Sequence, residues 1–139
     1  MGFWDAGPFD NDDAADFSGR LDDLPREDRA AAIREALREA ADCDGYLEGD
    51  VGAYAIAAAA LVARELSDGG ARLVAAGYGP KQPLPPLTTD LLPLAIAAID
   101  RTMADDSELA DEWSGVDGSD SPWHEKTREL RALLLLTAD

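Results

Sequence analysis

Clusters of carboxylates are the residues of this sequence best suited to chemistry, and the first cluster lies at residues 10–16. It holds four aspartates and one asparagine, whose oxygen atoms are the ligands that Ca²⁺ and Mg²⁺ prefer. The spacing departs from a calcium-binding EF-hand loop, because Ala15 stands where glycine is needed and Leu21 stands where a bidentate glutamate belongs. An Asp-rich helix N-terminus explains the same residues. We therefore predict no metal site.

The second cluster lies at residues 105–112, and its members are Asp105, Asp106, Glu108, Asp111 and Glu112. Glu108 shares one face of a predicted helix with Asp111 or Glu112. Paired carboxylates act as general acid and base when a cleft shifts their pKa values, and a sequence does not reveal such a cleft. A solvated helix face is the simplest interpretation, and a surface that binds a basic partner together with Trp113 is the functional one.

The chain has one cysteine, Cys43, and one histidine, His124, so neither an internal disulfide nor a Cys/His zinc site is expected. A dyad of these two residues is disfavoured, because Asp42 and Asp44 on either side of the thiol oppose formation of the thiolate. The glycines at residues 77–81 lack the ending of a phosphate-binding loop. We predict no catalytic residue and no cofactor.

The net charge narrows the classes of partner. The 139 residues include 29 acidic and 12 basic side chains, which gives a formal charge of −17. This charge repels nucleic-acid phosphates and anionic lipids. The uncharged run at residues 51–63 is shorter than the roughly 20 apolar residues that span a bilayer, and the N-terminus lacks a signal-peptide pattern. We expect a cytoplasmic protein without nucleic-acid or membrane partners; association with a second copy stays open.

Most of the acidity lies in two stretches of the chain. Residues 1–28 contain nine acids against two bases, and residues 100–125 contain nine acids against one base. If the two stretches meet in the fold, they form one acidic face for a basic partner. The alternative is that the acidity reflects a salt-adapted or GC-rich genome, in which surface carboxylates keep proteins soluble.

The elements that must position these residues are helices. Apolar residues recur at helical spacing after N-caps at Asp10 or Asn11, Thr88 or Thr89, Ser107 and Ser121. The predicted helices cover residues 11–24, 25–44, 48–66, 88–103, 108–113 and 121–137, with a Gly/Pro-rich loop at 67–87, a short helix candidate at 72–76 inside it, and a polar loop at 115–120. No segment alternates with period two. We predict an all-α fold, a single compact domain (residues 1–139) of five to six helices.

The centre of this domain is predicted at residues 48–66. The alanine-rich run within it offers no charged face to solvent, and a helix that is apolar on nearly all sides belongs in a core. We expect Ile56, Leu61 and Val62 to be among the most buried residues.

The two ends of the chain carry a distinctive pattern. Its members are Met1-Gly2-x-Trp4-x-x-Gly7-Pro8-Phe9-Asp10-Asn11-Asp12-x-Ala14-x-Asp16-Phe17, then Ser107-Glu108-Leu109, Glu112-Trp113 and Trp123. The pattern resembles an uncharacterised bacterial family, domain of unknown function 4259, over essentially the whole chain. The resemblance implies no activity and no catalytic residue. Because large aromatics near chain ends usually tie those ends together, we expect residues 4–9 to pack around Trp113 and Trp123.

Two hypotheses of function follow. The first is a non-enzymatic acidic protein-interaction module of the immunity, antitoxin or inhibitor type, which binds a basic protein such as a nuclease through residues 105–113. The second is a small carboxylate-based or metal-dependent enzyme that uses the same carboxylates. The small size, the single histidine and the lack of a recognised catalytic motif favour the first hypothesis.

Overall fold

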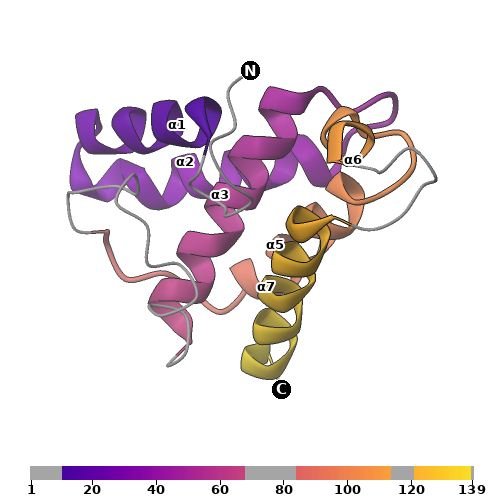
Figure 1. The fold of residues 1–139 in the computed structure, drawn as a ribbon. Helices are drawn as coiled ribbons and strands as arrows, with labels where there is room; N and C mark the ends of the chain where they lie inside the picture. The colour runs from indigo at the N-terminus through magenta and orange to yellow at the C-terminus, as the bar shows by residue number, and fades with distance from the viewer. Residues whose placement is uncertain (1–10, 68–83, 114–120, 139) are drawn as a thin grey trace.

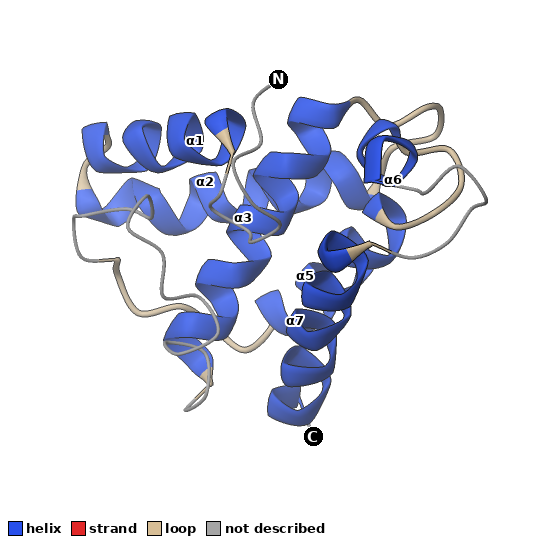
Figure 2. Ribbon diagram, in the orientation of Figure 1, coloured by secondary structure: helices blue, strands red, loops and turns tan. Residues whose placement is uncertain are grey.

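The computed structural model describes residues 11–67, 84–113 and 121–138, and within them the all-α prediction is confirmed (Figure 1). The described residues form helices and no strand, apart from a single bridge between Leu47 and Ser107 (Figure 2). The helices are α1 (Asp12–Asp23), α2 (Arg26–Ala41), α3 (Gly49–Leu66), α5 (Leu91–Thr102), α6 (Glu108–Trp113) and α7 (Pro122–Ala138). The segment at 4–9, the helix candidate at 72–76, the loop at 115–120 and most of the loop at 67–87 lie outside the described residues.

Helix α3 is the centre of the domain, as predicted. It packs against each of the other five described helices. Every residue from Ala55 to Ala63 is buried, and Ile56, Leu61 and Val62 are 3%, 0% and 0% exposed. Because alanine side chains are small, the neighbouring helices approach the α3 backbone closely. Gly52 shows the closeness: a Cβ atom there would lie 3.1 Å from Thr102 Cγ2 of α5. None of the described helices is long and apolar enough to cross a membrane.

The ends of α1 and α2 follow from local chemistry. Asn11 is the N-cap of α1, and its side-chain oxygen accepts a hydrogen bond of 2.8 Å from the Ala14 amide. Helix α1 ends at Asp23, and its C-cap Leu24 adopts an extended backbone because proline follows it. Helix α2 ends at Ala41, before the predicted stop at residues 44–45. The reason is that the Cys43 amide bonds to the Ala40 carbonyl at 3.2 Å, which tightens the last turn.

Helix α5 starts later than the predicted caps at Thr88 and Thr89. Asp90 is its N-cap residue, and Thr88 and Thr89 contribute backbone carbonyls that accept from the Leu91 and Leu92 amides at 3.1 Å. The carboxylate of Asp90 turns away from the helix to accept from the Thr88 hydroxyl and to pair with Arg34 of α2 at 2.8 Å. The tertiary ion pair therefore takes the place of a local cap.

The last two helices start where the sequence predicts. Ser107 caps α6, and its hydroxyl accepts from the Ala110 amide at 3.4 Å. Ser121 does the same for α7, where the His124 amide lies 3.4 Å from the serine hydroxyl and Pro122 is the first helical residue. Buried Trp123, with Leu130 and Leu134 below it, fixes α7 against α3 and α5.

The arrangement of helix ends decides what the surface offers. The N-terminal ends of α1 and α3 lie at the same edge of the molecule as α6, which is the upper edge in Figure 1. The C-terminal end of α7 lies at the opposite edge. Acidic side chains of the first turns, which a helix dipole favours, are thereby gathered at one edge of the domain.

Candidate functional site

A short bridged unit fixes α6 beside the start of α3. The Leu47 amide donates to the Asp106 carbonyl and the Glu108 amide donates to the Leu47 carbonyl, each at 2.9 Å. Arg101 at the end of α5 completes the unit, because its guanidinium donates to the backbone carbonyls of Cys43, at 3.1 Å, and Gly45. The two loops that carry the candidate residues are therefore held together by backbone hydrogen bonds and by the Arg101 side chain.

Glu108 caps a helix that is distant in sequence. Its Oε1 atom accepts a hydrogen bond of 2.6 Å from the Gly49 amide, at the start of α3. Glu48, the N-cap residue of α3, makes no side-chain capping bond of its own. A Cβ atom at position 49 would lie 3.0 Å from the same Oε1, so glycine there allows the carboxylate to approach the amide closely. Glu108 is therefore a structural residue as well as a member of the predicted acidic cluster.

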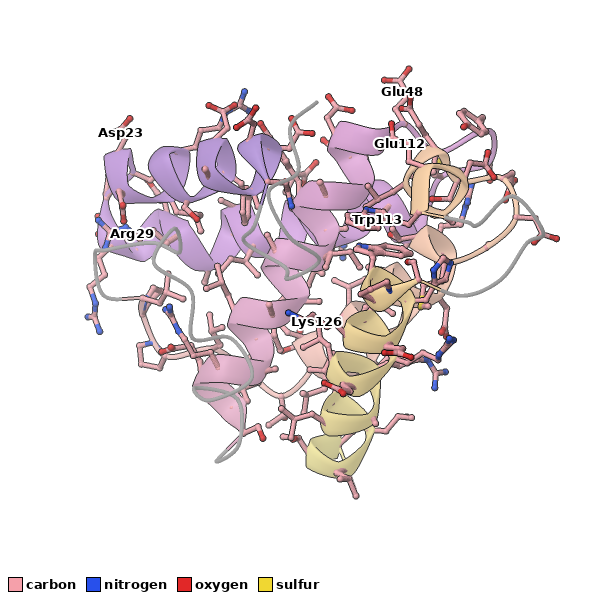
Figure 3. The ribbon with its side chains drawn as sticks, viewed as in Figure 1. Asp23, Arg29, Glu48, Glu112, Trp113 and Lys126 are labelled. Atoms are coloured by element: carbon pink, nitrogen blue, oxygen red, sulfur yellow. The ribbon has the colours of Figure 1, made fainter. Side chains whose placement is uncertain are left out.

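Seven carboxylates from three helices converge at this edge, and we call them the acidic face. They are Asp12, Asp13 and Asp16 of α1, Asp50 of α3, and Glu108, Asp111 and Glu112 of α6. Figure 3 shows Glu112 at this edge, above Trp113 in the view. The two acidic stretches of the sequence thus meet, and α3 contributes a member that the sequence did not single out.

The pKa values report how close these like charges are. Burial raises the pKa of Asp13, and the carboxylates of Asp50, Asp12, Asp16 and Glu108 raise it further. Burial also raises the pKa of Glu112, together with the carboxylates of Glu108 and Asp13. Among the described residues, Asp16 is the member of the face that has a basic side chain in ion-pair contact, Arg20 at 3.7 Å. At neutral pH the face is therefore a concentrated negative surface.

Tyr46 gives the acidic face an exposed aromatic ring. The residue is 54% exposed, and its hydroxyl donates to Asp111 Oδ2 at 3.2 Å. Partial desolvation, that hydrogen bond and the charge of Asp111 raise the pKa of the Tyr46 hydroxyl, so the ring stays neutral. Large exposed aromatics surrounded by charge are frequent anchors in protein interfaces.

The predicted site residues separate into distinct roles. Glu108, Asp111 and Glu112 belong to the acidic face, whereas Asp106 is held by Arg101 at 3.2 Å and Asp105 lies exposed in the turn before α6. Trp113 is half-buried and packs against the core. Of the N-terminal motif, Trp4, Gly7, Pro8, Phe9 and Asp10 lie outside the described residues. Asn11 and Asp12 start α1, while Phe17 and Trp123 are core residues.

The described residues of this site offer carboxylates, a tyrosine hydroxyl and backbone groups that act through charge and hydrogen bonds. In the part of the chain that the structure describes, no group of three or more His, Cys, Asp or Glu side chains is placed to hold a metal ion. The Cys43 thiol lies 3.5 Å from the Gly45 carbonyl and 3.7 Å from Arg101, while His124 Nδ1 is 2.9 Å from the Ser121 hydroxyl. Cys43 and His124 thus have separate partners and form no dyad.

A comparison with protein families fits the pattern at the chain ends. The model of the family described as domain of unknown function (DUF4259) matches residues 2–126. The chain belongs to this family. No curated protein and no solved structure matches the chain. All seven carboxylates of the acidic face, and Tyr46 with them, lie inside the matched DUF4259 region.

Sequence reasoning missed four residues of the candidate site: Tyr46, Gly49, Asp50 and Arg101. The signal for Gly49 was present, since a glycine at the start of an otherwise alanine-rich helix indicates close approach by another group. The other three residues show no such signal. Their roles depend on contacts with residues that are distant in the chain, as the 56 to 65 residues that separate Arg101 from Gly45 and Tyr46 from Asp111 illustrate.

Proposed function

We propose that this DUF4259 domain is a non-enzymatic interaction module whose acidic face, with Tyr46 at its rim, binds a basic protein. The observation that carries the proposal is the convergence of seven carboxylates from α1, α3 and α6 beside an exposed aromatic ring. Charge complementarity of this kind steers association and selects partners of the opposite sign.

The repulsion between ionised carboxylates of the acidic face supports this proposal. Raised pKa values at Asp13 and Glu112 mean that the ionised carboxylates are less favourable in the folded domain than in water. A cationic surface brought against the face would relieve that repulsion. Stability is commonly sacrificed in this way at functional sites, because residues there are placed for a partner rather than for the fold.

Tyr46 supplies an aromatic anchor, which the carboxylates of the acidic face do not. Rim charges mainly accelerate association, whereas buried aromatic anchors account for much of the affinity of an interface. The ring lies beside Asp111 on the rigid bridged unit, so it is presented without a large ordering cost on binding. A face that combines both features fits a module of the immunity, antitoxin or inhibitor type, which covers the basic surface of a protein such as a nuclease.

The proposal is tested on the basic protein that the full chain captures from its native organism. Replacing Asp111→Asn and Glu112→Gln together is expected to slow association about fivefold and to change dissociation less, since the lost interaction is long-range charge. The matched control is Glu27→Gln with Asp28→Asn, which neutralises two adjacent exposed acids at the start of α2. Asp23 and Arg29 mark that distant side of the domain in Figure 3.

A second variant isolates the aromatic anchor. Tyr46→Ala is expected to accelerate dissociation about tenfold while leaving the association rate nearly unchanged. Equal association rates for the acidic-face variant and its control would overturn the proposal.

A further inference from the structure

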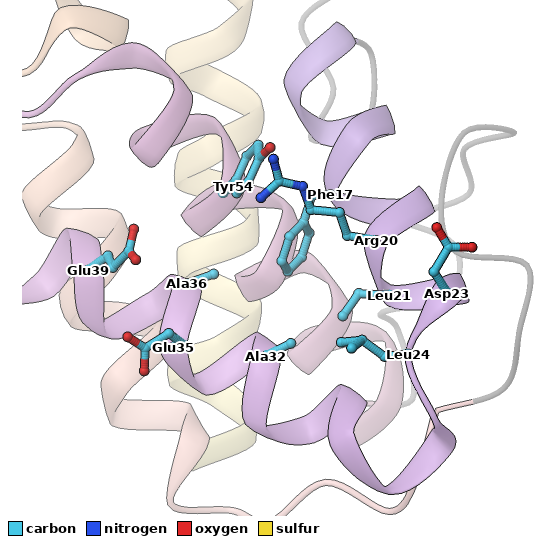
Figure 4. Close-up of a pocket in the computed structure, with 10 residues that line it drawn as sticks. All are labelled: Phe17, Arg20, Leu21, Asp23, Leu24, Ala32, Glu35, Ala36, Glu39 and Tyr54. Carbon is cyan, nitrogen blue, oxygen red and sulfur yellow. The ribbon is translucent and has the colours of Figure 1, made fainter.

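A groove between α1 and α2 is the feature of the described residues that the acidic face does not use. It encloses about 460 Å³ (Figure 4). Its apolar lining consists of Phe17 and Leu21 of α1, Leu24 at the C-cap of α1, Ala32 and Ala36 of α2, and Tyr54 of α3. The groove exists because α1 and α2 each pack against α3 and contact each other little. The small side chains of Ala32 and Ala36 leave the space between them open.

The walls of the groove are fixed rather than loose. Arg29 of α2 is buried, and its Nε atom donates to the Leu21 carbonyl at 2.8 Å, which ties the end of α1 to α2. Tyr54 is held by three contacts: its hydroxyl donates to Asp16 at 3.0 Å, its ring lies 5.3 Å from that of Phe17, and the Arg20 guanidinium lies over it at 5.4 Å. A ligand would therefore enter a largely preformed site.

The rim of the groove is negative. Asp23 of α1 and the pair Glu35 and Glu39 of α2 stand around the apolar lining. No basic side chain of the described residues is in ion-pair contact with any of the three. The fourth charged residue of the rim, Arg20, is engaged by Asp16 at 3.7 Å and by the Tyr54 ring. Glu35 and Glu39 share one helix face, where like charges repel.

The apolar lining and the negative rim together specify the class of ligand that fits the groove. The apolar lining takes aliphatic or aromatic side chains, and the three carboxylates take cations placed beside them. A groove between two helices accommodates the apolar face of a third helix, whose flanking lysines or arginines would reach Glu35 and Glu39. The occupant is therefore both basic and amphipathic.

The groove and the acidic face are connected along α1. Asp16 belongs to the acidic face and accepts from Tyr54, which lines the groove, and the 12 residues of α1 span about 18 Å. We propose that the groove binds the apolar side of a basic amphipathic helix from the same protein partner that covers the acidic face. This inference rests on the proposed function and adds to it the class of segment that the partner must contain.

The test uses the full-length chain and three labelled helical peptides as probes. The first peptide has leucine on one face and lysine on the other; the second has alanine in place of every leucine; the third has glutamate in place of every lysine. We expect the leucine–lysine peptide to bind about tenfold more tightly than the alanine peptide, and the glutamate peptide not to bind. Equal affinities for the leucine and alanine peptides would overturn the inference.

Two variants locate the binding. Ala32→Phe fills the groove from a half-buried position, so the leucine and alanine peptides should then bind equally. Glu35→Gln with Glu39→Gln leaves the lining intact and is expected to weaken the leucine–lysine peptide about fivefold. The control is Glu125→Gln with Glu129→Gln, an exposed pair of the same spacing on α7. An equal loss of peptide affinity in the control would overturn the inference. So would the finding that the wild-type protein self-associates and that Ala32→Phe converts it to a monomer.

The captured basic partner separates failure of this inference from failure of the proposed function. About fivefold slower association of the Asp111→Asn, Glu112→Gln variant, with wild-type binding in Ala32→Phe, would leave the acidic face as the interface and remove the groove from it. Wild-type binding of the partner by both variants would contradict the proposed function itself.

Discussion

The acidic face and the ends of α5 use carboxylates in opposite ways. At the start of α5, Asp90 pairs with Arg34 of α2 at 2.8 Å, and near its end Asp100 accepts from Arg131 of α7 at 2.6 and 3.1 Å. The hydrogen bond from Arg34 lowers the pKa of Asp90, and the hydrogen bond to Asp100 raises the pKa of Arg131. On the acidic face the pKa values of Asp13 and Glu112 are raised instead.

This difference bears on why the protein is acidic. If the acidity reflected only a genome that favours acidic surfaces, the carboxylates would be distributed without regard to the fold. In this domain, however, the basic side chains lie where they join one helix to another. Arg34 joins α2 to α5, Arg131 joins α7 to α5, and Arg101 joins two loops. The acidic face, by comparison, has Arg20 at its margin. Because the chain supplies arginines at structural contacts, the concentrated negative charge of the face calls for a separate explanation, which the proposed basic partner would provide.

The largest effect is expected from the cap that Glu108 makes on α3. Glu108→Ala should lower the free energy of unfolding by about 1–2 kcal/mol, because it leaves the Gly49 amide without its acceptor even though it removes a like charge. Urea denaturation measures the change. Glu108→Gln, which keeps an oxygen acceptor, should lose less. A gain of stability in Glu108→Ala would mean that repulsion on the face outweighs the cap.

The same chemical change should have opposite signs in the two regions. Asp100→Asn removes the partner of Arg131 and is expected to destabilise the domain by about 0.5–1 kcal/mol. Glu112→Gln removes one of several like charges and is expected to stabilise it by up to about 0.5 kcal/mol. The urea denaturation midpoints of the two variants, measured side by side, give the two changes in stability. If both variants lost stability by the same amount, the two regions would not differ in the way proposed.

Most of the fold could be predicted from the sequence because its signals are local. Asn11, Ser107 and Ser121 cap helices through bonds that span three residues, and the burial of α3 follows from its own composition. The prediction at Thr88 and Thr89 was wrong by a short distance, because the ion pair of Asp90 with Arg34 involves another helix.

The candidate site could be predicted only in part. Charge counting indicates that two acidic stretches form one face if they meet, and the carboxylates of Asp13 and Glu108 are near enough for the charge of Glu108 to raise the pKa of Asp13. The membership of Asp50, the cap from Glu108 to Gly49 across 59 residues, and the exposure of Tyr46 are tertiary facts. No periodicity within a single helix encodes them.

The pH dependence of stability gives a smaller effect. A carboxyl with a raised pKa binds protons more tightly in the folded state, so the free energy of unfolding should rise as pH falls from neutral towards the ordinary values of 3.8 for Asp13 and 4.5 for Glu112. Asp90 acts in the opposite sense, because its contribution is lost as pH falls below 3.8 through its lowered pKa. Thermal unfolding of Asp13→Asn with Glu112→Gln should show a flatter rise; an unchanged profile would contradict the assignment.

Salt should have the smallest effect on stability. Screening beyond about 8 Å at 0.15 M ionic strength weakens repulsion across the acidic face, so the melting temperature should rise by about 1 °C as salt is added. Asp13→Asn with Asp50→Asn should show a smaller rise. A melting temperature that falls with added salt would mean that the ion pairs at α5 dominate the electrostatics of the domain.

The central claim is that the acidic face is a binding surface, and the association rate of the captured basic partner as a function of ionic strength tests it most directly. The account predicts a rate that falls steeply with salt in the wild-type chain. It also predicts a visibly shallower dependence in the Asp111→Asn, Glu112→Gln variant, with the Glu27→Gln, Asp28→Asn control matching wild type. Identical salt dependence in all three proteins would show that the partner binds elsewhere and that the acidity of this face serves no association.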